Sequence, residues 1–154
     1  MAKRRSLKGD PCPVARALDV IGDRWSLLIV RDAFDGIRRF GAFQKNLNVA
    51  RNILSDRLSR LVDNGILAVQ PASDGTAYPE YVLTSTGRAL FAVVVTLRQW
   101  GEGHLFDSGE PHSHLRVIDG STQVAEVQVR GADGRVLQPD ETRVEKVFGQ
   151  APAT

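Results

Sequence analysis

Residues 50–64 hold the side chains whose types and spacing best fit a chemical task, namely contact with a nucleic acid. At about 3.6 residues per turn, the apolar residues of this stretch fall on one side of a helix, and short polar residues fall on the other. Arginines flank the polar side. Short hydrogen-bonding groups suit base edges in the major groove, and guanidinium groups suit phosphates. The residues that we predict to contact DNA are Arg39, Arg51, Asn52, Ser55, Arg57, Ser59 and Arg60.

These arginines also have a purely structural interpretation. Arg57 and Arg60 are placed to form salt bridges with Asp56 or Asp63, and Arg39 suits bracing of the fold as well as it suits a phosphate. The local charge favours a polyanion, because residues 36–60 hold six Lys or Arg residues and one Asp. An ordinary surface helix that carries three arginines is the alternative.

Cys12 is the sole cysteine of the sequence and directly precedes Pro13, where a helix is predicted to begin. A helix N-terminus stabilises negative charge, so this position suits a thiolate that senses oxidants. Because the sequence holds no second cysteine, a switch would need an intersubunit disulfide, a low-molecular-weight thiol or an adduct. The alternative is a half-buried residue with a structural role at the start of the helix.

A third group of reactive side chains lies in residues 104–114, where three histidines and two acidic residues fall within eleven positions. Such groups are typical of metal ligation or metal-assisted hydrolysis. Gly109 and Pro111 make the stretch a linker, however, and nothing in the sequence forces the side chains to converge. We therefore predict no metal site, no cofactor and no enzymatic activity. The residues considered are His104, Asp107, Glu110, His112 and His114.

The bulk composition fits a cytoplasmic protein with one main domain. The 154 residues are 42% hydrophobic, which is enough for a packed core, and no secretion signal is recognisable at the N-terminus. Residues 90–97 form the longest strongly apolar run, which is too short to cross a membrane. Residues 1–106 carry a net charge of +5 and residues 107–154 a net charge of −3. We predict a basic flexible tail over 1–10, a main domain over 11–106 and a small acidic extension over 107–154.

The elements that would position these side chains follow in order along the main domain. Helices are predicted over 13–21, over 25–34 with Asp23 as N-cap, over 38–47 and over 50–64. A tight connection between the last two is what a helix-turn-helix requires. Two β-prone runs, 66–69 and 81–83, then flank a loop rich in turn formers and predict a β-hairpin wing.

A final helix is predicted from residue 84 to about 101, and it is apolar around nearly its whole circumference. Such a helix must bury more than one face, so we predict a homodimer. The residues predicted at the dimer interface are Val14, Leu18, Phe91, Val94, Leu97 and Trp100. Short β-prone runs after residue 114, separated by Asp-Gly turns, predict a β-rich extension. The expected fold class is α+β: a winged helix-turn-helix domain with flanking dimerisation helices and a small C-terminal β-rich extension.

The stretch from Cys12 to about His104 resembles the HxlR family of bacterial transcriptional regulators in many ordered positions. The matching residues include Cys12-Pro13, Ile21-Gly22, Trp25, Arg31-Asp32, Arg39-Phe40, Leu54-Ser55, Arg57-Leu58, Leu61, Gly65, Glu80-Tyr81, Leu83-Thr84, Gly87 and Trp100-Gly101. The resemblance implies a homodimer on an inverted-repeat DNA operator. It also implies that some members sense oxidants or electrophiles such as quinones through the cysteine near the N-terminus.

The sequence departs from the family pattern at several positions. Ala42 stands where a Glu is usual, Ala50 stands where a Ser often begins the recognition helix, and the wing lacks any Lys or Arg. The C-terminal part resembles a tail that carries paired cysteines in some members, and no cysteine is present here, so no metal role is carried over. The expected function is regulation of transcription through double-stranded DNA, with any small-molecule effector unassigned. The alternative is a winged-helix protein-interaction module that does not bind DNA, which the bare wing favours.

Overall fold

The computed structural model describes residues 4–147, and these divide into two compact units. The first unit comprises residues up to Phe91 together with those from Lys146, and the second comprises Ala92–Glu145. Within the described residues, no helix is both long and apolar enough to cross a membrane.

The first unit begins with two helices that start where the sequence predicts. Helix α1 spans Pro13–Ile21 with a proline in its first turn, where the missing N–H costs no hydrogen bond. Helix α2 spans Arg24–Phe34. Its N-cap, Asp23, accepts hydrogen bonds from the backbone N–H groups of Trp25 and Ser26. The predicted cap is therefore confirmed, because the carboxylate satisfies two N–H groups that the helix leaves free.

The next two helices form the helix-turn-helix. Helix α3 spans Phe40–Leu47 and ends at Asn48, which adopts the left-handed conformation with φ of 49°. Helix α4 spans Arg51–Asp63, with Ala50 in the N-cap position and no side-chain cap. Asn48 therefore ends the first helix and does not cap the second. Between them, Val49 is buried, so the short turn is anchored in the core.

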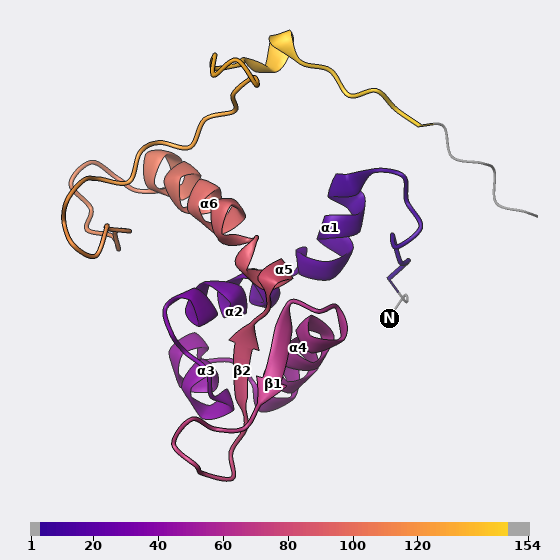
Figure 1. Cartoon of the computed structure of the whole chain (residues 1–154), viewed down its shortest axis with the longest axis vertical. Coiled ribbons are helices and arrows are strands. Elements are labelled where there is room, and N and C mark those ends of the chain that lie inside the picture. Colours follow the sequence, from indigo (N-terminus) through magenta and orange to yellow (C-terminus); the bar gives the residue numbers. More distant parts are fainter. Residues whose placement is uncertain (1–3, 148–154) are drawn as a thin grey trace, which may run out of the picture. The chain divides into compact units, whose positions relative to one another are not determined.

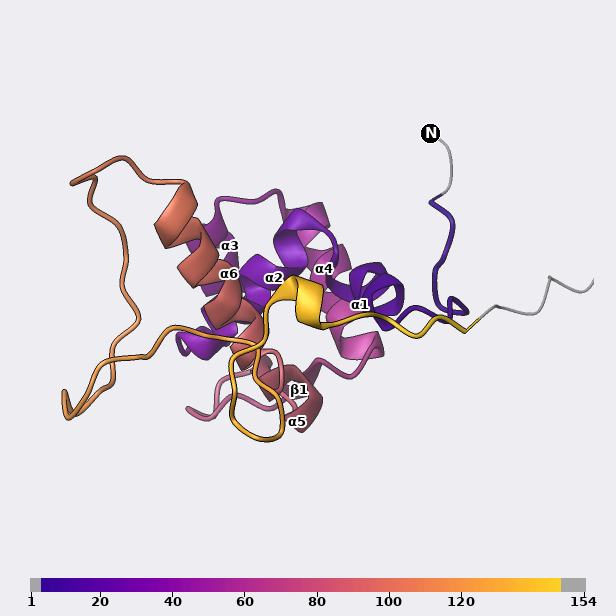
Figure 2. The same ribbon diagram turned by 90° about the horizontal axis from the view of Figure 1, so that it is seen from above.

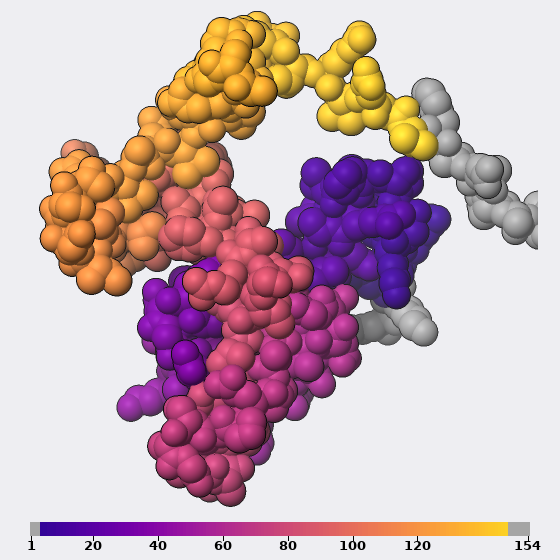
Figure 3. Space-filling view, in the orientation of Figure 1, coloured from indigo at the N-terminus to yellow at the C-terminus, as the bar shows by residue number. Residues whose placement is uncertain are grey.

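A two-stranded antiparallel sheet forms the wing (Figure 1). Strand β1 spans Leu67–Gln70 and strand β2 spans Glu80–Leu83, with Leu67 opposite Leu83 and Gln70 opposite Glu80. Gly65, at φ of 71°, makes the reversal from α4 into β1 that a residue with a side chain would resist. The loop between the strands projects beyond the helices as a separate lobe in the space-filling view (Figure 3).

The core of the first unit lies between α2, α3, α4 and the start of β1. Burial of the apolar side chains of these elements is the main force that holds the helix-turn-helix together. Asp32 is fully buried in the same region, where it pairs with Arg31 at 2.8 Å and accepts a hydrogen bond from Asn46 on α3 at 2.8 Å. The fully buried apolar side chains are Ile29, Val30, Phe43, Leu54, Leu58, Leu61 and Leu67.

The single helix predicted over residues 84–101 is wrong, because the chain forms two helices there. Helix α5 spans Ser85–Arg88, and helix α6 spans Phe91–His104. The Thr84 hydroxyl caps α5 by accepting from the Gly87 N–H at 3.0 Å. Gly87 packs so closely on Ile66, the residue before β1, that a Cβ there would lie 2.1 Å from the carbonyl oxygen of Ile66. A turn at residues 89–90 separates α5 from α6.

The predicted C-terminal β-rich extension is also wrong. In residues 107–147 no strand forms; the chain runs as a long coil with a 3₁₀ turn at Pro139–Glu141 and one isolated bridge between Arg130 and Val136 (Figure 2). A strand needs a neighbouring strand to satisfy its backbone groups. Here the Gln99 side chain on α6 takes that place, donating to the Ala125 carbonyl at 2.9 Å and accepting from the Val127 N–H at 2.7 Å. The composition of these segments favours extended backbone, but the segments do not pair with one another as strands.

Candidate nucleic-acid interface

Helix α4 presents a polar face to solvent opposite its buried leucines. Most of the residues predicted from sequence to contact DNA lie together on this face, because they recur every three to four positions. Its acidic members, Asp56 and Asp63, lie among them and lower the net positive charge. The predicted residues exposed on this face are Arg51, Asn52, Ser55, Ser59 and Arg60.

Arg57 differs from the other predicted contacts, because it is turned toward the protein. Its Nε donates to Asp23 Oδ1 at 3.0 Å, and its Nη1 donates to Asp56 on the same helix. Only 22% of the side chain is exposed. Arg57 therefore joins α4 to the N-cap of α2, a contact between residues 34 positions apart that sequence reasoning did not find.

The Asp23 carboxylate is the centre of this contact. Partial burial on its own raises the pKa of Asp23, but hydrogen bonds from Ser26, Arg57 and Trp25 outweigh burial and lower the pKa below its ordinary value. The same balance raises the pKa of Arg57: burial lowers it, and the bonds to Asp23 and Asp56 more than compensate. The charged forms of both groups are thus the ones that the fold stabilises.

Two arginines near the start of the helix-turn-helix have intramolecular partners. The Arg51 guanidinium lies over the Phe40 ring at 5.1 Å from its centroid, which holds the side chain at the N-terminal end of α4. Arg39 donates to the carboxylate of Asp74 at the wing tip and to the Thr76 hydroxyl at 3.3 Å. Arg39 therefore braces the wing against the start of α3, in keeping with the structural role that sequence left open.

The wing tip carries a negative charge that the arginine offsets. The Thr76 N–H, followed by Arg39, lowers the pKa of Asp74 to about 2, so the carboxylate is ionised at neutral pH. Where the loop joins β2, Glu80 is only 4% exposed and accepts from the hydroxyl and the N–H of Ser73. These two bonds are the largest causes that lower the pKa of Glu80, and hydrogen bonds from Gln70 and Arg38 lower it further. Charge-assisted hydrogen bonds therefore hold the loop at its tip and where it joins β2.

The residues predicted at the dimer interface lie on α1 and α6. Each of these helices leaves apolar side chains open to solvent: Val14 is 64% exposed on α1, and Leu97 and Trp100 are 51% and 57% exposed on α6. Leu18 and Phe91 are also exposed, whereas Val94 is half-buried. Exposed apolar side chains that gather on a helix are typical of a surface that another molecule covers.

Cys12 lies exposed at the N-cap position of α1. Its backbone N–H donates to Asp10 Oδ1 at 2.8 Å, so the turn before the helix is held while the thiol stays accessible. The exposure of the Cys12 thiol agrees with a reactive role, whereas the structural alternative expected a half-buried side chain.

The histidine-rich stretch converges in part. His112 and His114 approach Glu102 of α6, and the candidate ligand atoms of the three lie within 4.8 Å of one another. His104 instead contacts the Trp100 carbonyl oxygen through Nδ1 at 2.9 Å, and its ring stacks on the Trp100 ring. The Glu110 carboxylate accepts a hydrogen bond from the Asp107 N–H. Sequence reasoning missed Glu102, because its proximity to the histidines depends on a reversal of the chain after α6.

The arrangement of α3, α4 and the β1–β2 wing defines a winged helix-turn-helix protein. Comparison with family models gives the family: residues 20–108 match the HxlR-like helix-turn-helix model, and the chain belongs to this family. The resemblance seen in the sequence is therefore confirmed.

Similar proteins span most of the chain. The HTH-type transcriptional regulator Rv3095 of Mycobacterium tuberculosis is 49% identical over 103 residues, which cover 67% of this chain and 65% of that protein. The crystal structure of PA1607 is 50% identical, covers 92% of this chain and 99% of its own, and superposes with a TM-score of 0.86. The redox regulator HypR in its reduced form is 30% identical, covers 61% of this chain and 94% of its own, and has a TM-score of 0.56.

Proposed function

We propose that this protein is a transcriptional regulator that binds double-stranded DNA as a homodimer in the bacterial cytoplasm. The single observation that carries the proposal is the exposed polar face of α4, where Asn52, Ser55 and Ser59 lie between Arg51 and Arg60. Membership of the HxlR-like family supports it, and so does the similarity to the HTH-type transcriptional regulator Rv3095.

In this proposal α4 lies in the major groove. The short side chains of Asn52 and Ser55, in the N-terminal half of the helix, contact base edges, and Arg51 and Arg60 contact phosphates. Arg57 positions the helix through Asp23 and contributes to DNA binding through that bond rather than as a free cation. Arg39 approaches the backbone only if it leaves Asp74, because the two are paired at the wing tip.

The dimer in this proposal forms through the exposed apolar residues of α1 and α6. A twofold dimer presents two copies of α4, and each reads one half of an inverted repeat. The two half-sites are then separated by about 34 Å, one turn of the DNA helix, or by a multiple of it. The operator is symmetric for the same reason.

We further propose that Cys12 makes the regulator responsive to oxidants or electrophiles. The thiol is exposed at a helix N-terminus, where both access and the helix dipole favour reaction. The structural similarity to HypR, which has been solved in reduced and oxidized forms, supports this assignment.

The test begins with selection of a preferred duplex from random DNA by the purified protein. Binding of the selected and of a scrambled duplex is then measured over a salt series for Arg51→Ala, Arg60→Ala and Asn52→Ala. Each arginine variant should weaken both complexes and lower the salt slope by about one unit. Asn52→Ala should cost about 1–3 kcal/mol on the selected duplex if it makes a bidentate base contact, and little on the scrambled one.

Two results would contradict this proposal. Failure to select any duplex is one. The other is a pair of arginine variants that bind like the parent protein with the same salt slope. A winged-helix module that binds protein instead would then be the better account.

A further inference from the structure

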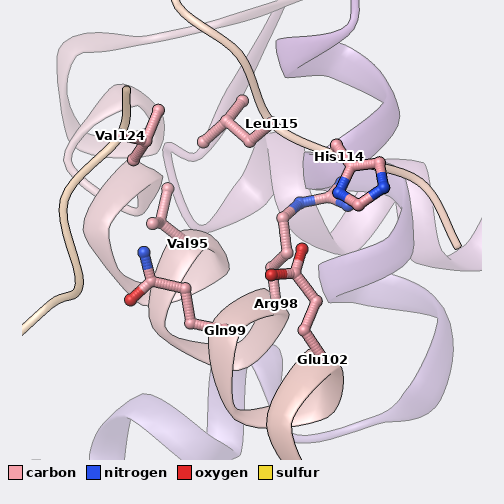
Figure 4. A pocket seen from close by; sticks show the side chains of 7 residues that line it. All are labelled: Val95, Arg98, Gln99, Glu102, His114, Leu115 and Val124. Atoms are coloured by element: carbon pink, nitrogen blue, oxygen red, sulfur yellow. The ribbon is translucent and has the colours of Figure 1, made fainter. Parts of the chain in front are cut away.

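The second unit holds a group of side chains of metal-ligating types that the proposed DNA-binding function does not use. Glu102 lies near the end of α6, and His112 and His114 lie on the chain that returns along this helix. Glu102 and His114 line a small hollow with Arg98 and Val95, and Figure 4 shows the Glu102 and His114 side chains on the same side of it. We propose that Glu102, His112 and His114 bind a divalent transition-metal ion, with Zn²⁺ the best match.

The donor set supports this choice of metal. Two imidazoles and one carboxylate are ligands that zinc accepts, and three protein ligands leave one tetrahedral position for water or another molecule. The three ligand atoms lie within 4.8 Å of one another. Zinc binds nitrogen and oxygen at about 2.0–2.2 Å, so the three ligand atoms must draw closer together when an ion binds, and the exposure of His114 leaves its side chain room to rotate. A hard ion such as Mg²⁺ would prefer oxygen ligands.

The turn that brings the two histidines together is held in place. Ser113, which separates them, accepts at its hydroxyl from Arg98 Nη1 at 2.8 Å, and this bond ties the turn to α6 one helical turn before Glu102. The histidine rings lie 4.3 Å apart, and the Phe106 ring packs on His112 at 4.8 Å. The turn that carries the two histidines is therefore anchored to α6 before an ion binds.

One hydrogen bond also suits His112 for ligation. Its Nδ1 lies 3.0 Å from the Ser113 carbonyl oxygen. Donation from Nδ1–H to this carbonyl leaves the lone pair on Nε2, which is the form that a metal needs. Metal-bound histidines usually make such a bond with their second nitrogen.

The charge around the site sets the expected strength of binding. The Glu102 carboxylate supplies one negative charge, whereas the Arg98 guanidinium, which Figure 4 shows beside Glu102 and His114, opposes a dication. Arg98 is held by Ser113, so its charge cannot leave the region without releasing the turn. We therefore expect weaker binding than at a closed four-ligand zinc site.

The experiment uses the full chain without an affinity tag, treated with chelator and then dialysed. Zn²⁺ binding is measured by titration calorimetry, and Co²⁺ is used as a coloured probe of coordination geometry. One ion per chain should bind, with the visible spectrum of tetrahedral Co²⁺. Loss of a hydrogen bond that supports a ligand already costs about 10–100-fold in metal affinity, so loss of a ligand should cost at least about tenfold.

Three ligand variants and one matched control separate this site from general histidine binding. His112→Ala, His114→Ala and Glu102→Gln should each lose at least tenfold in affinity, whereas His104→Ala should bind like the parent protein. Glu102→Gln keeps the shape of the side chain and serves if an alanine variant misfolds. Absence of saturable Zn²⁺ binding would overturn the proposal. So would equal weakening by His104→Ala and His112→Ala.

Discussion

Arg57 on the proposed reading helix donates its Nε–H to Asp23 Oδ1 at 3.0 Å, and Asp23 is the same carboxylate that caps α2. One oxygen thus accepts from the backbone of α2 and from a side chain of α4. The start of α2 and the orientation of α4 are coupled through this residue.

Substitution of Asp23 should separate its two roles. Asparagine caps helices nearly as well as aspartate but cannot form the ion pair, whereas alanine does neither. We expect Asp23→Asn to lower the free energy of unfolding by about 1 kcal/mol, through loss of a charged hydrogen bond. Asp23→Ala should cost about 1 kcal/mol more, from the lost cap. Urea unfolding at pH 7 measures both, and equal stability of the parent protein and Asp23→Asn would show that the charge contributes nothing.

The same contact makes a prediction about pH. The pKa of Asp23 is lower in the folded protein than its ordinary value of 3.8, so the folded state binds this proton less readily than the unfolded state. The stabilisation is therefore complete above about pH 4 and is lost as the pH falls through the folded pKa. Unfolding curves at pH 7, 4 and 3 should show the parent protein losing its advantage over Asp23→Asn at the acid end. A constant difference between the two would contradict the assignment.

Removal of the acidic residue at the wing tip should strengthen DNA binding. Asp74→Asn removes a negative charge and releases Arg39 from its ion pair, so the guanidinium becomes free to approach a phosphate. We expect tighter binding to selected and scrambled DNA alike, with the salt slope steeper by about one unit. Asp119→Asn is the control, because Asp119 accepts a similar turn hydrogen bond from the Ser121 N–H but has no arginine in its turn. If both variants gain equally, net charge alone is responsible.

The dimer prediction is tested at Leu97. This side chain is exposed in the single chain, so Leu97→Glu should leave the fold of the subunit intact while placing a charge in the proposed interface. Val94 is less suitable, because it is half-buried within the chain itself. Light scattering should report a dimer for the parent protein and for Ile118→Glu, an equivalent change at an exposed position outside α1 and α6. Leu97→Glu should be monomeric, and a monomeric parent protein would refute the dimer.

Cys12→Ser tests the proposed sensing of oxidants. Serine keeps the size of the side chain and removes the reactive thiol, so DNA affinity should stay within a few-fold of the parent value. Peroxide or quinone should weaken DNA binding by the parent protein only. Because the sequence has no other cysteine, a response that persists in Cys12→Ser would exclude thiol chemistry as its cause.

Local signals in the sequence predicted the winged helix-turn-helix well. The apolar spacing of α4, the Asp23 cap and the turn residues between β1 and β2 each act over a few positions, so they can be read without the fold. The contacts that modify the candidate site act over longer distances. Arg57 meets Asp23 across 34 positions and Arg39 meets Asp74 across 35, and no local pattern indicates either pair.

The two wrong predictions have the same physical origin. The helix expected over 84–101 stops at Arg88, and α5 lies against a distant part of the chain, because Gly87 closely approaches the Ile66 carbonyl. The β-prone runs after residue 114 stay apart because a strand depends on a partner, and here a glutamine side chain supplies two of the hydrogen bonds. Propensity describes which secondary structure a segment favours, and the segments that pack against it decide whether that structure forms.

The junction of the wing with α5 has a consequence for the order of folding. The Thr84 hydroxyl contacts the carbonyl oxygens of both Gly65 and Ile66, at sequence separations of 19 and 18, and its backbone N–H donates to Ile66. Closing so short a loop costs little entropy, and hairpins form within about 1–10 μs. The wing can therefore close early as a local unit, before the longer-range bond between α2 and α4 is made. Amides of β1 and β2 should then gain hydrogen-exchange protection during refolding no later than those of α2.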